Sequence, residues 1–240
     1  MKNEKGFAVI LLLACLPVLI SGLLLLSSVF GFMQSDLAMK YQCRVHGQQG
    51  QKQVAPHLEK LLSLNVTARR LKIEEVAAYA KIAASAGNPP ALAAAKARLI
   101  KIQNQKRQLD LKQKQLINQA NMSLASSFSK TRKELTKNQE SLSNILFISN
   151  GFHVSGTRPT LAVRPDSSDT APTYSPVPGF EEKQALAHEW QYTLAVRKPF
   201  SQFLEGRFQF RKACAVSLSE ENTTWVPKII KGKFSLKSVW

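Results

Sequence analysis

Residues 7–33 read FAVILLLACLPVLISGLLLLSSVFGFM, and this stretch decides the fold because no charged residue occurs between Lys5 and Asp36. At about 1.5 Å per residue, a helix of this length is roughly 40 Å long, which exceeds the ~30 Å hydrocarbon core of a bilayer. A cleaved secretory signal has an apolar region of only about 7–15 residues. The stretch therefore predicts a transmembrane helix that remains in the mature protein.

The flanks of this helix bear on its orientation. Residues 1–6 form a short tail that carries Lys2 and Lys5, and such a tail is easily left in the cytoplasm. Lys40 and Arg44 on the other flank act in the opposite direction under the positive-inside rule. We expect residues 1–6 to be a cytoplasmic tail or leader, and the protein to be a single-pass inner-membrane protein whose body is periplasmic or extracytoplasmic.

The composition excludes several protein classes. The chain has 240 residues, with 33 Lys or Arg against 16 Asp or Glu, a formal net charge of +17. Its hydrophobic residues, 44% of the total, are concentrated at the N-terminus, which is not typical of an ordinary soluble protein. Three cysteines and 11 glycines exclude a disulfide-dense scaffold and a collagen-like repeat.

Residues 34–147 carry helical patterns. We expect the anchor helix to run on to about Gly47 and to end at a Gly/Gln hinge, residues 47–51. Apolar residues then recur at three- and four-residue intervals up to Ala86, and again, with heptad spacing, from Ala91 to Phe147. Gly87-Asn88-Pro89-Pro90 separates the two runs as a helix stop and start. The pattern predicts a coiled-coil-like antiparallel hairpin, with a break in its second helix near residues 121–129. This hairpin is either a rod that positions something above the membrane or a plain helical bundle.

The remaining chain changes character twice. Residues 148–183 hold five of the 11 prolines with clustered Ser, Thr and Asp, a composition typical of a linker or of long loops. Residues 184–240 are rich in aromatic and β-branched residues with stretches of alternation, which predicts a small antiparallel β-rich region. The fold class is therefore α+β.

Two cysteines lie far apart in sequence but on the same predicted side of the membrane. Cys43 follows the anchor and Cys214 lies in a predicted strand. In an oxidising compartment a bond between them would clamp the sheet to the foot of the anchor helix. The alternative, two unrelated buried thiols, stays open because sequence alone does not establish pairing.

The second helix is strongly basic. Between Pro90 and Lys137, 11 cationic residues stand against only Asp110 and Glu134, and they are Lys96, Arg98, Lys101, Lys106, Arg107, Lys112, Lys114, Lys130, Arg132, Lys133 and Lys137. Such a field attracts anions, so they are candidates for an anion-binding face; the alternative is a solvated surface. The run lacks a nucleic-acid fold signature and interleaved aromatics, and we expect no sequence-specific nucleic-acid binding.

The sequence contains no motif that indicates a catalysed reaction. His46, His57, His153 and His188 are scattered, and there is no nucleophile elbow, phosphate loop or Cys/His cluster at metal-ligand spacing. We expect a protein that is not an enzyme and that has no catalytic residues, no metal and no cofactor.

The N-terminus resembles a known leader. Lys5-Gly6-Phe7 followed at once by an apolar helix is similar to the leader of type IV pilins and pseudopilins, which implies cleavage between Gly6 and Phe7. The sequence has Leu11 where that family usually carries a glutamate. The layout also resembles the TadE/TadG-like proteins of tight-adherence (Flp) pili, which implies pilus or other envelope subunits as partners.

These observations lead to two hypotheses. The first is a single-span, envelope-facing structural or interaction protein, pilin-like or associated with a Tad pilus, whose partners are membrane lipid and other envelope subunits. The second is a bitopic adaptor whose basic helical rod binds an anionic surface or partner protein.

Overall fold

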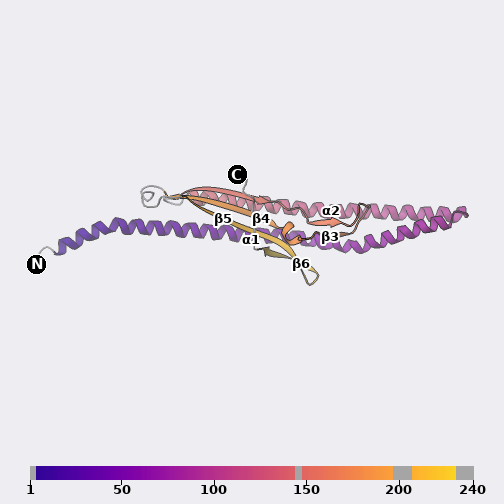
Figure 1. The fold of residues 1–240 in the computed structure, drawn as a ribbon, viewed down its shortest axis with the longest axis horizontal. Helices are drawn as coiled ribbons and strands as arrows, with labels where there is room; N and C mark the ends of the chain where they lie inside the picture. Colours follow the sequence, from indigo (N-terminus) through magenta and orange to yellow (C-terminus); the bar gives the residue numbers. More distant parts are fainter. Residues whose placement is uncertain (1–3, 144–147, 197–206, 231–240) are drawn as a thin grey trace.

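The helix α1 runs the length of the molecule, the shorter antiparallel helix α2 pairs with its C-terminal part, and a small antiparallel sheet lies along them (Figure 1). The structure is a computed structural model that describes residues 4–143, 148–196 and 207–230. In chain order the elements are α1 (Glu4–Ala84), α2 (Pro89–Ser143), β1 (Ile148–Thr157), β2 (Val163–Pro165), β3 (Tyr174–Pro176), α3 (Phe180–Lys183), β4 (Leu186–Val196), β5 (Arg207–Glu221) and β6 (Thr224–Ile230). The predicted α+β architecture, with an apolar helix, a helical hairpin and a sheet, is confirmed.

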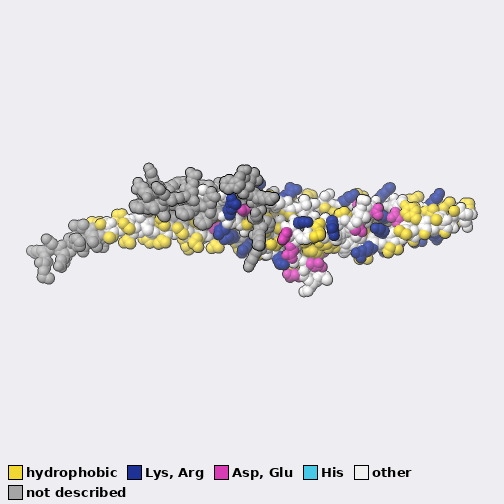
Figure 2. All heavy atoms as spheres, viewed as in Figure 1, with side chains coloured by type: hydrophobic (Ala, Val, Ile, Leu, Met, Phe, Trp, Pro, Cys, Tyr) yellow, Lys and Arg dark blue, Asp and Glu magenta, His cyan; other side chains and the backbone are white. Residues whose placement is uncertain are grey.

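The N-terminal part of α1 is an uncovered apolar stem. Every side chain from Leu13 to Ile20 is exposed, with Val18 at 72%. Figure 2 shows this stem as a mainly hydrophobic rod end without charged side chains. The helix is long and apolar enough to cross a membrane, and an apolar surface this large marks contact with lipid or protein.

The Gly/Gln segment at residues 47–51 is not a hinge, so that prediction is wrong: α1 passes through it as one continuous helix. The glycines serve close packing instead. A Cβ at Gly47 would lie 2.7 Å from Val216 Cγ2, and one at Gly50 would collide with the Ser127 side chain. Each glycine costs about 1 kcal/mol of helix propensity relative to alanine. In return, β5 and α2 approach the α1 backbone at these two positions.

The turn between the helices forms where the sequence predicts it. Asn88 begins α2 by accepting a hydrogen bond from the Ala91 backbone N–H at its Oδ1, at 3.3 Å. Pro89 and Pro90 occupy the first turn, where no intrahelical N–H is needed. The predicted break near residues 121–129 is wrong, because α2 is continuous to Ser143. One serine of this segment faces the interior: Ser127 is buried, and its small side chain leaves room for α1.

The main sheet has the strand order β1-β4-β5-β6, with all neighbours antiparallel. The prediction of a linker or loops for residues 148–183 is wrong for β1, which pairs with β4 along its whole length. That strand was missed because its Ser, Asn and Gly residues imitate loop composition, whereas the prolines begin only at Pro159. Parts of the predicted β-rich region, 197–206 and 231–240, lie outside the described residues.

The core is a chain of small clusters between the helices and the sheet. The central cluster joins Leu58 and Leu61 of α1 to Leu124 of α2 and to Leu186 and Leu218 of the sheet, all at most 1% exposed. A second cluster nearer the stem contains Met39, Cys43, Leu135, Trp190 and Tyr192. A distal cluster joins the two helices to the segment between β2 and β3, and it contains Ala68, Leu71, Ala78, Ile102, Leu109 and Ala171. The sheet is therefore packed at the stem end of the hairpin, and the far end is bare helix.

Candidate functional site

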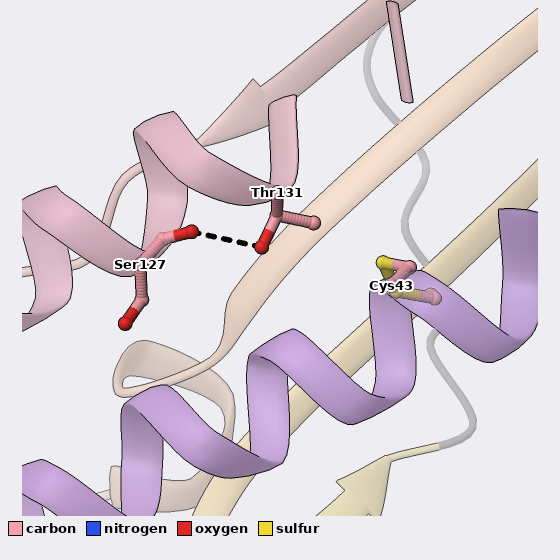
Figure 3. The surroundings of a disulfide bond; sticks show 4 residues. Cys43, Ser127 and Thr131 are labelled. Atoms are coloured by element: carbon pink, nitrogen blue, oxygen red, sulfur yellow. Dashed lines mark hydrogen bonds between the residues drawn. A yellow bond between two sulfur atoms is a disulfide. The ribbon is translucent and has the colours of Figure 1, made fainter. Parts of the chain in front are cut away.

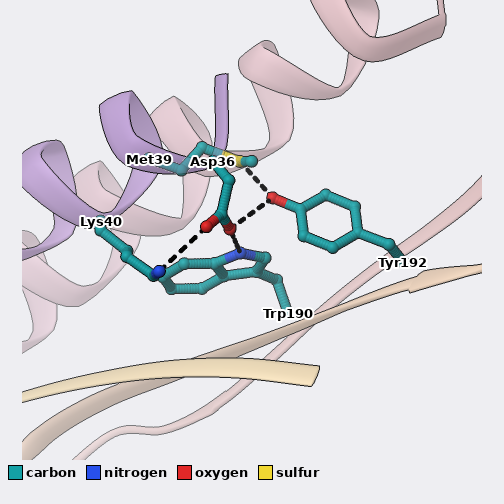
Figure 4. Close-up of polar contacts among 5 residues, drawn as sticks. All are labelled: Asp36, Met39, Lys40, Trp190 and Tyr192. Carbon is teal, nitrogen blue, oxygen red and sulfur yellow. Dashed lines mark hydrogen bonds and ion pairs between the residues drawn. The ribbon is translucent and has the colours of Figure 1, made fainter. Parts of the chain in front are cut away.

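A buried carboxylate lies where the stem of α1 meets the sheet. Asp36 is 8% exposed, and its Oδ1 accepts hydrogen bonds from Trp190 Nε1 at 3.4 Å and from the Tyr192 hydroxyl at 3.2 Å. Its Oδ2 lies 2.9 Å from Lys40 Nζ. Figure 4 shows the three partners converging on the carboxylate from α1 and β4. Both oxygens are thus satisfied, which a buried carboxylate requires.

Tyr192 is held as a hydrogen-bond donor in this cluster. Burial raises the pKa of its hydroxyl above the usual range, and the neighbouring Asp36 carboxylate raises that pKa further. Aromatic rings enclose it: Phe32 lies edge-on at 5.0 Å between ring centroids, and Phe152 lies at 5.4 Å. The anchor helix and the sheet are therefore joined by polar contacts inside an apolar shell.

A disulfide bond also links α1 to the sheet, at a position on α1 beyond Asp36 and Lys40. Cys43 and Cys214 are bonded, with their Cα atoms 6.5 Å apart and 171 residues between them in sequence. Figure 3 shows the bond between α1 and β5, with Ser127 and Thr131 of α2 beside it. Of the two alternatives that the sequence left open, the structure has the bonded pair. The bond is consistent with a protein that is membrane-anchored or extracytoplasmic.

Two glutamines fasten the sheet to α1 beyond the disulfide. Gln51, fully buried, donates through Nε2 to the carbonyl oxygens of Gln184 at 2.8 Å and Val216 at 3.0 Å. Gln184 Oε1 in turn accepts a hydrogen bond from the Ala162 backbone N–H at 2.8 Å. We name Asp36, Lys40, Cys43, Gln51, Gln184, Trp190, Tyr192 and Cys214 the junction. It fixes the position of the sheet on α1.

The basic residues of α2 are distributed in two rows. Multiples of 7, 11 and 18 residues return to the same side of a helix. By this spacing, one row contains Lys96, Arg107, Lys114 and Arg132, and the other contains Arg98, Lys101, Lys112, Lys130 and Lys137, with Lys133 between them. The buried seam of α2 lies between these rows on one side, and Lys133 lies between them on the exposed side.

Two members of the basic set have acidic partners. Lys106 is buried, and its Nζ lies 2.6 Å from Glu75 Oε2 on α1. Lys114 Nζ lies 2.7 Å from Asp110 Oδ2, which raises the pKa of Lys114. The other nine are exposed. The field that an anion would meet therefore comes from those nine, whereas Lys106 joins the two helices.

His188 is buried without a hydrogen-bond partner for either ring nitrogen. It is 2% exposed and stacks on Phe128 at 4.6 Å between ring centroids. Burial, and secondarily the charge of Arg132, lower the pKa of His188 to about 4. Within the described ranges, no group of three or more His, Cys, Asp or Glu side chains could hold a metal ion.

Part of the junction can be predicted from the sequence, and the rest cannot. The cysteine pair was one of the two alternatives that the sequence offered, because Cys43 and Cys214 fall on the same predicted side of the membrane. The contacts of Gln51, Gln184, Trp190 and Tyr192 were missed, since they depend on strand register. One feature of the sequence could have indicated these contacts: Trp190 and Tyr192 lie two residues apart on one predicted strand, and Asp36 is the first charged residue after the apolar run.

The proposed leader site lies at the start of α1. Gly6 and Phe7 belong to this helix, and their side chains are outside the described ones. Cleavage between them stays a prediction. In comparisons with known proteins, no family model, no curated protein and no solved structure matches this chain.

Proposed function

We propose that this chain is a single-span protein of the cell envelope that holds a helical rod on the outer side of the inner membrane and binds partner molecules there. The observation that carries the proposal is the continuity of α1. One helix begins as an exposed apolar stem and continues, without a break, into a rod fastened to a sheet by a disulfide. A stem of this kind suits lipid, and the disulfide suits an oxidising compartment.

The length of the rod supports a role in positioning. From residue 34 to Ala84, α1 extends for about 75 Å at 1.5 Å per residue. The far part of the hairpin presents exposed apolar side chains, which are Val66 at 75%, Ile73 at 70%, Val76 at 66% and Tyr79 at 52% on α1, and Ile100 at 58% on α2. Figure 2 shows hydrophobic side chains gathered at this hairpin end. Since they are held away from the membrane, they are our candidate surface for other envelope subunits.

A protease site placed in the helical turn tests the topology. The site replaces residues of the exposed turn at Gly87 and Asn88, and protease is added outside intact spheroplasts. We expect cleavage there, and none when the protease meets only the cytoplasmic face. Because Cys43 and Cys214 lie on opposite sides of the cut, the two fragments should migrate together without reductant and separate with it.

The control is the Cys43→Ala variant with the same protease site, whose fragments should separate without reductant. Cleavage that requires permeabilised membranes would place the rod in the cytoplasm and reject the proposal. Recovery of the full-length protein from the soluble fraction would reject the anchor.

A second candidate function rests on the nine exposed cations of α2. In this version the rod binds an anionic surface or an acidic partner, and the attraction should weaken as salt is added. Binding to vesicles with anionic headgroups is measured at low and high ionic strength. Changing Lys96, Arg107 and Arg132 to Gln should weaken binding, with Lys106→Gln as the comparison for a buried, paired lysine. Affinity that does not depend on salt would reject this candidate.

The pilin resemblance gives the first proposal a narrower form, in which the chain is a pilin-like or Tad-pilus-associated subunit. Its support is the Lys5-Gly6-Phe7 sequence ahead of the apolar helix. Mass spectrometry of protein purified from its native membrane should then find Phe7 at the N-terminus. An intact Met1 would reject this narrower form and leave the membrane-anchored rod unaffected.

A further inference from the structure

The strands of the sheet run alongside α1 and can be measured against it. Cys214 of β5 is bonded to Cys43, and Tyr192, which pairs with Phe210 of β5, packs on Phe32 and Asp36. Four strand residues from Cys214 to Phe210 cover about 13 Å, and about nine helix residues cover the same distance. Nine residues before Cys43 is residue 34, between Phe32 and Asp36. The two independent contacts therefore agree that strand and helix are nearly parallel.

The same measurement locates the end of the sheet. β5 begins at Arg207, seven residues before Cys214, or about 23 Å nearer the N-terminus of α1. About 15 helix residues span that distance, so Arg207 is level with roughly residue 28. Val196 and Ile148 pair with each other at the same end of the sheet. We call these three strand ends the rim. The rim thus stands beside residues that the sequence assigns to the membrane span, 7–33.

Burial along α1 gives the same level. All side chains from Leu13 to Ile20 are exposed, whereas Leu25 is half-buried and Ser28 is 8% exposed. Phe32, Asp36 and Met39 continue this covered side at helical spacing. The covering of α1 therefore begins between residues 21 and 28, since Ser21 is also half-buried, and the strand lengths place the rim at the outer end of this interval.

Among the strands that the structure describes, the sheet has open edges at the rim. β1 is the first strand in the order, and among the described strands β5 from Arg207 to Cys214 pairs with β4 alone, because β6 pairs only with residues 215–221. Open edges carry unpaired backbone N–H and C=O groups and do not occur in hydrocarbon. The hydrocarbon core therefore does not extend outward past the level of residue 28, where the rim begins.

We propose that the outer hydrocarbon boundary lies near Leu25 and that the rim of the sheet contacts the lipid headgroups of the outer leaflet. From Phe7 to Leu25 a helix measures about 28 Å, close to the ~30 Å hydrocarbon core, whereas residues 7–33 are roughly 10 Å too long. The apolar residues Leu26, Phe30 and Met33 then belong to the exterior. This inference rests on the proposed single-span function and specifies its contact with lipid.

The test uses cysteine substitutions in the full-length Cys15→Ser protein, since the paired Cys43 and Cys214 do not react with maleimides. Five exposed positions at three- or four-residue spacing share the side of α1 away from the sheet, so they differ in depth alone; they are Leu19, Leu23, Ser27, Phe30 and Gln34. A membrane-impermeant maleimide is added outside intact spheroplasts. Leu19→Cys is the control for hydrocarbon and Gln34→Cys the control for water.

We expect Ser27→Cys and Phe30→Cys to be labelled about tenfold or more faster than Leu23→Cys, because a thiol must ionise in water to react. Labelling of Gln34→Cys alone would place the boundary near residue 33 and overturn the inference, while the single span would stand. Labelling of all five, Leu19→Cys included, would instead reject the membrane span itself. The two failures are therefore distinguishable.

Discussion

Removing the disulfide should destabilise the protein by an amount that follows from the length of the loop it closes. Cys43 and Cys214 are 171 residues apart, and both are buried. On the chain-entropy model a loop of this length restricts the unfolded state by about 5 kcal/mol. We expect Cys43→Ala, Cys214→Ala and the double variant to lose nearly the same free energy of unfolding, since each change removes the same bond.

Guanidinium unfolding in mild detergent, followed by tryptophan emission, measures this loss. Trp190 reports on the junction because it is fully buried beside it. With a slope of about 5 kcal/mol per molar for a chain of this size, the midpoint should fall by roughly 1 M. Cys15→Ala is the matched control, because Cys15 is exposed and unpaired, and its midpoint should not change.

Two results would refute the reasoning. If the effects of the two single variants add in the double variant, the cysteines stabilise the protein separately, by packing, and loop closure is not the cause. If reduced and oxidised wild-type protein unfold at the same midpoint, the bond does not restrict the unfolded chain.

Three further outcomes are expected from the junction and its surroundings. Asp36→Ala should lower the free energy of unfolding by about 1–3 kcal/mol more than Asp36→Asn, because only the amide keeps an acceptor for the buried donors. In the Tyr192→Phe background this difference should shrink. A difference that stays unchanged in denaturant titrations would contradict the contact between Asp36 and Tyr192. The pKa of His188 is about 4 in the folded protein against 6.5 in the unfolded chain, so the folded state binds fewer protons. The free energy of unfolding should therefore fall by about 3 kcal/mol as the pH drops from 6.5 to 4. His188→Gln should reduce this dependence on pH, and an equal dependence in both proteins would show that other groups cause it. Gly47→Ala should destabilise by about 1–3 kcal/mol, because its Cβ would overlap a valine of β5, whereas Gly87→Ala, with nothing within 4 Å of the added Cβ, is the control in the same thermal unfolding assay.

Periodicity made the helices predictable. Apolar spacing, the proline pair and Asn88 fixed the hairpin and its turn, because those signals act within a few residues. The predictions of a hinge at Gly47 and a break near Ser127 were wrong for one reason. Small residues usually indicate a helix break, whereas here they allow neighbouring elements of the core to pack closely. Local propensity, about 1 kcal/mol per residue, is overridden when a close tertiary contact needs the space.

Strand register was the part that the sequence did not reveal. Trp190 and Tyr192 meet Asp36 only because β4 lies against α1 in one particular alignment, and Gln51 reaches Val216 for the same reason. Residues 148–157 were assigned to loops because polar and small residues fill an edge strand as readily as a turn. The contacts of Asp36 with Trp190 and of Gln51 with Val216 thus join segments more than 100 residues apart, which composition and spacing do not encode.

The order of the two cysteines sets a schedule for biogenesis. In the proposed single-span topology, Cys43 is exported directly behind the anchor, while its partner lies 171 positions further along the chain. At a synthesis rate of about 5–20 residues per second, roughly 10–30 seconds pass before Cys214 arrives. During that interval Cys43 must stay reduced, or be returned to the thiol by exchange, and both helices of the hairpin are synthesised before the sheet that packs against them.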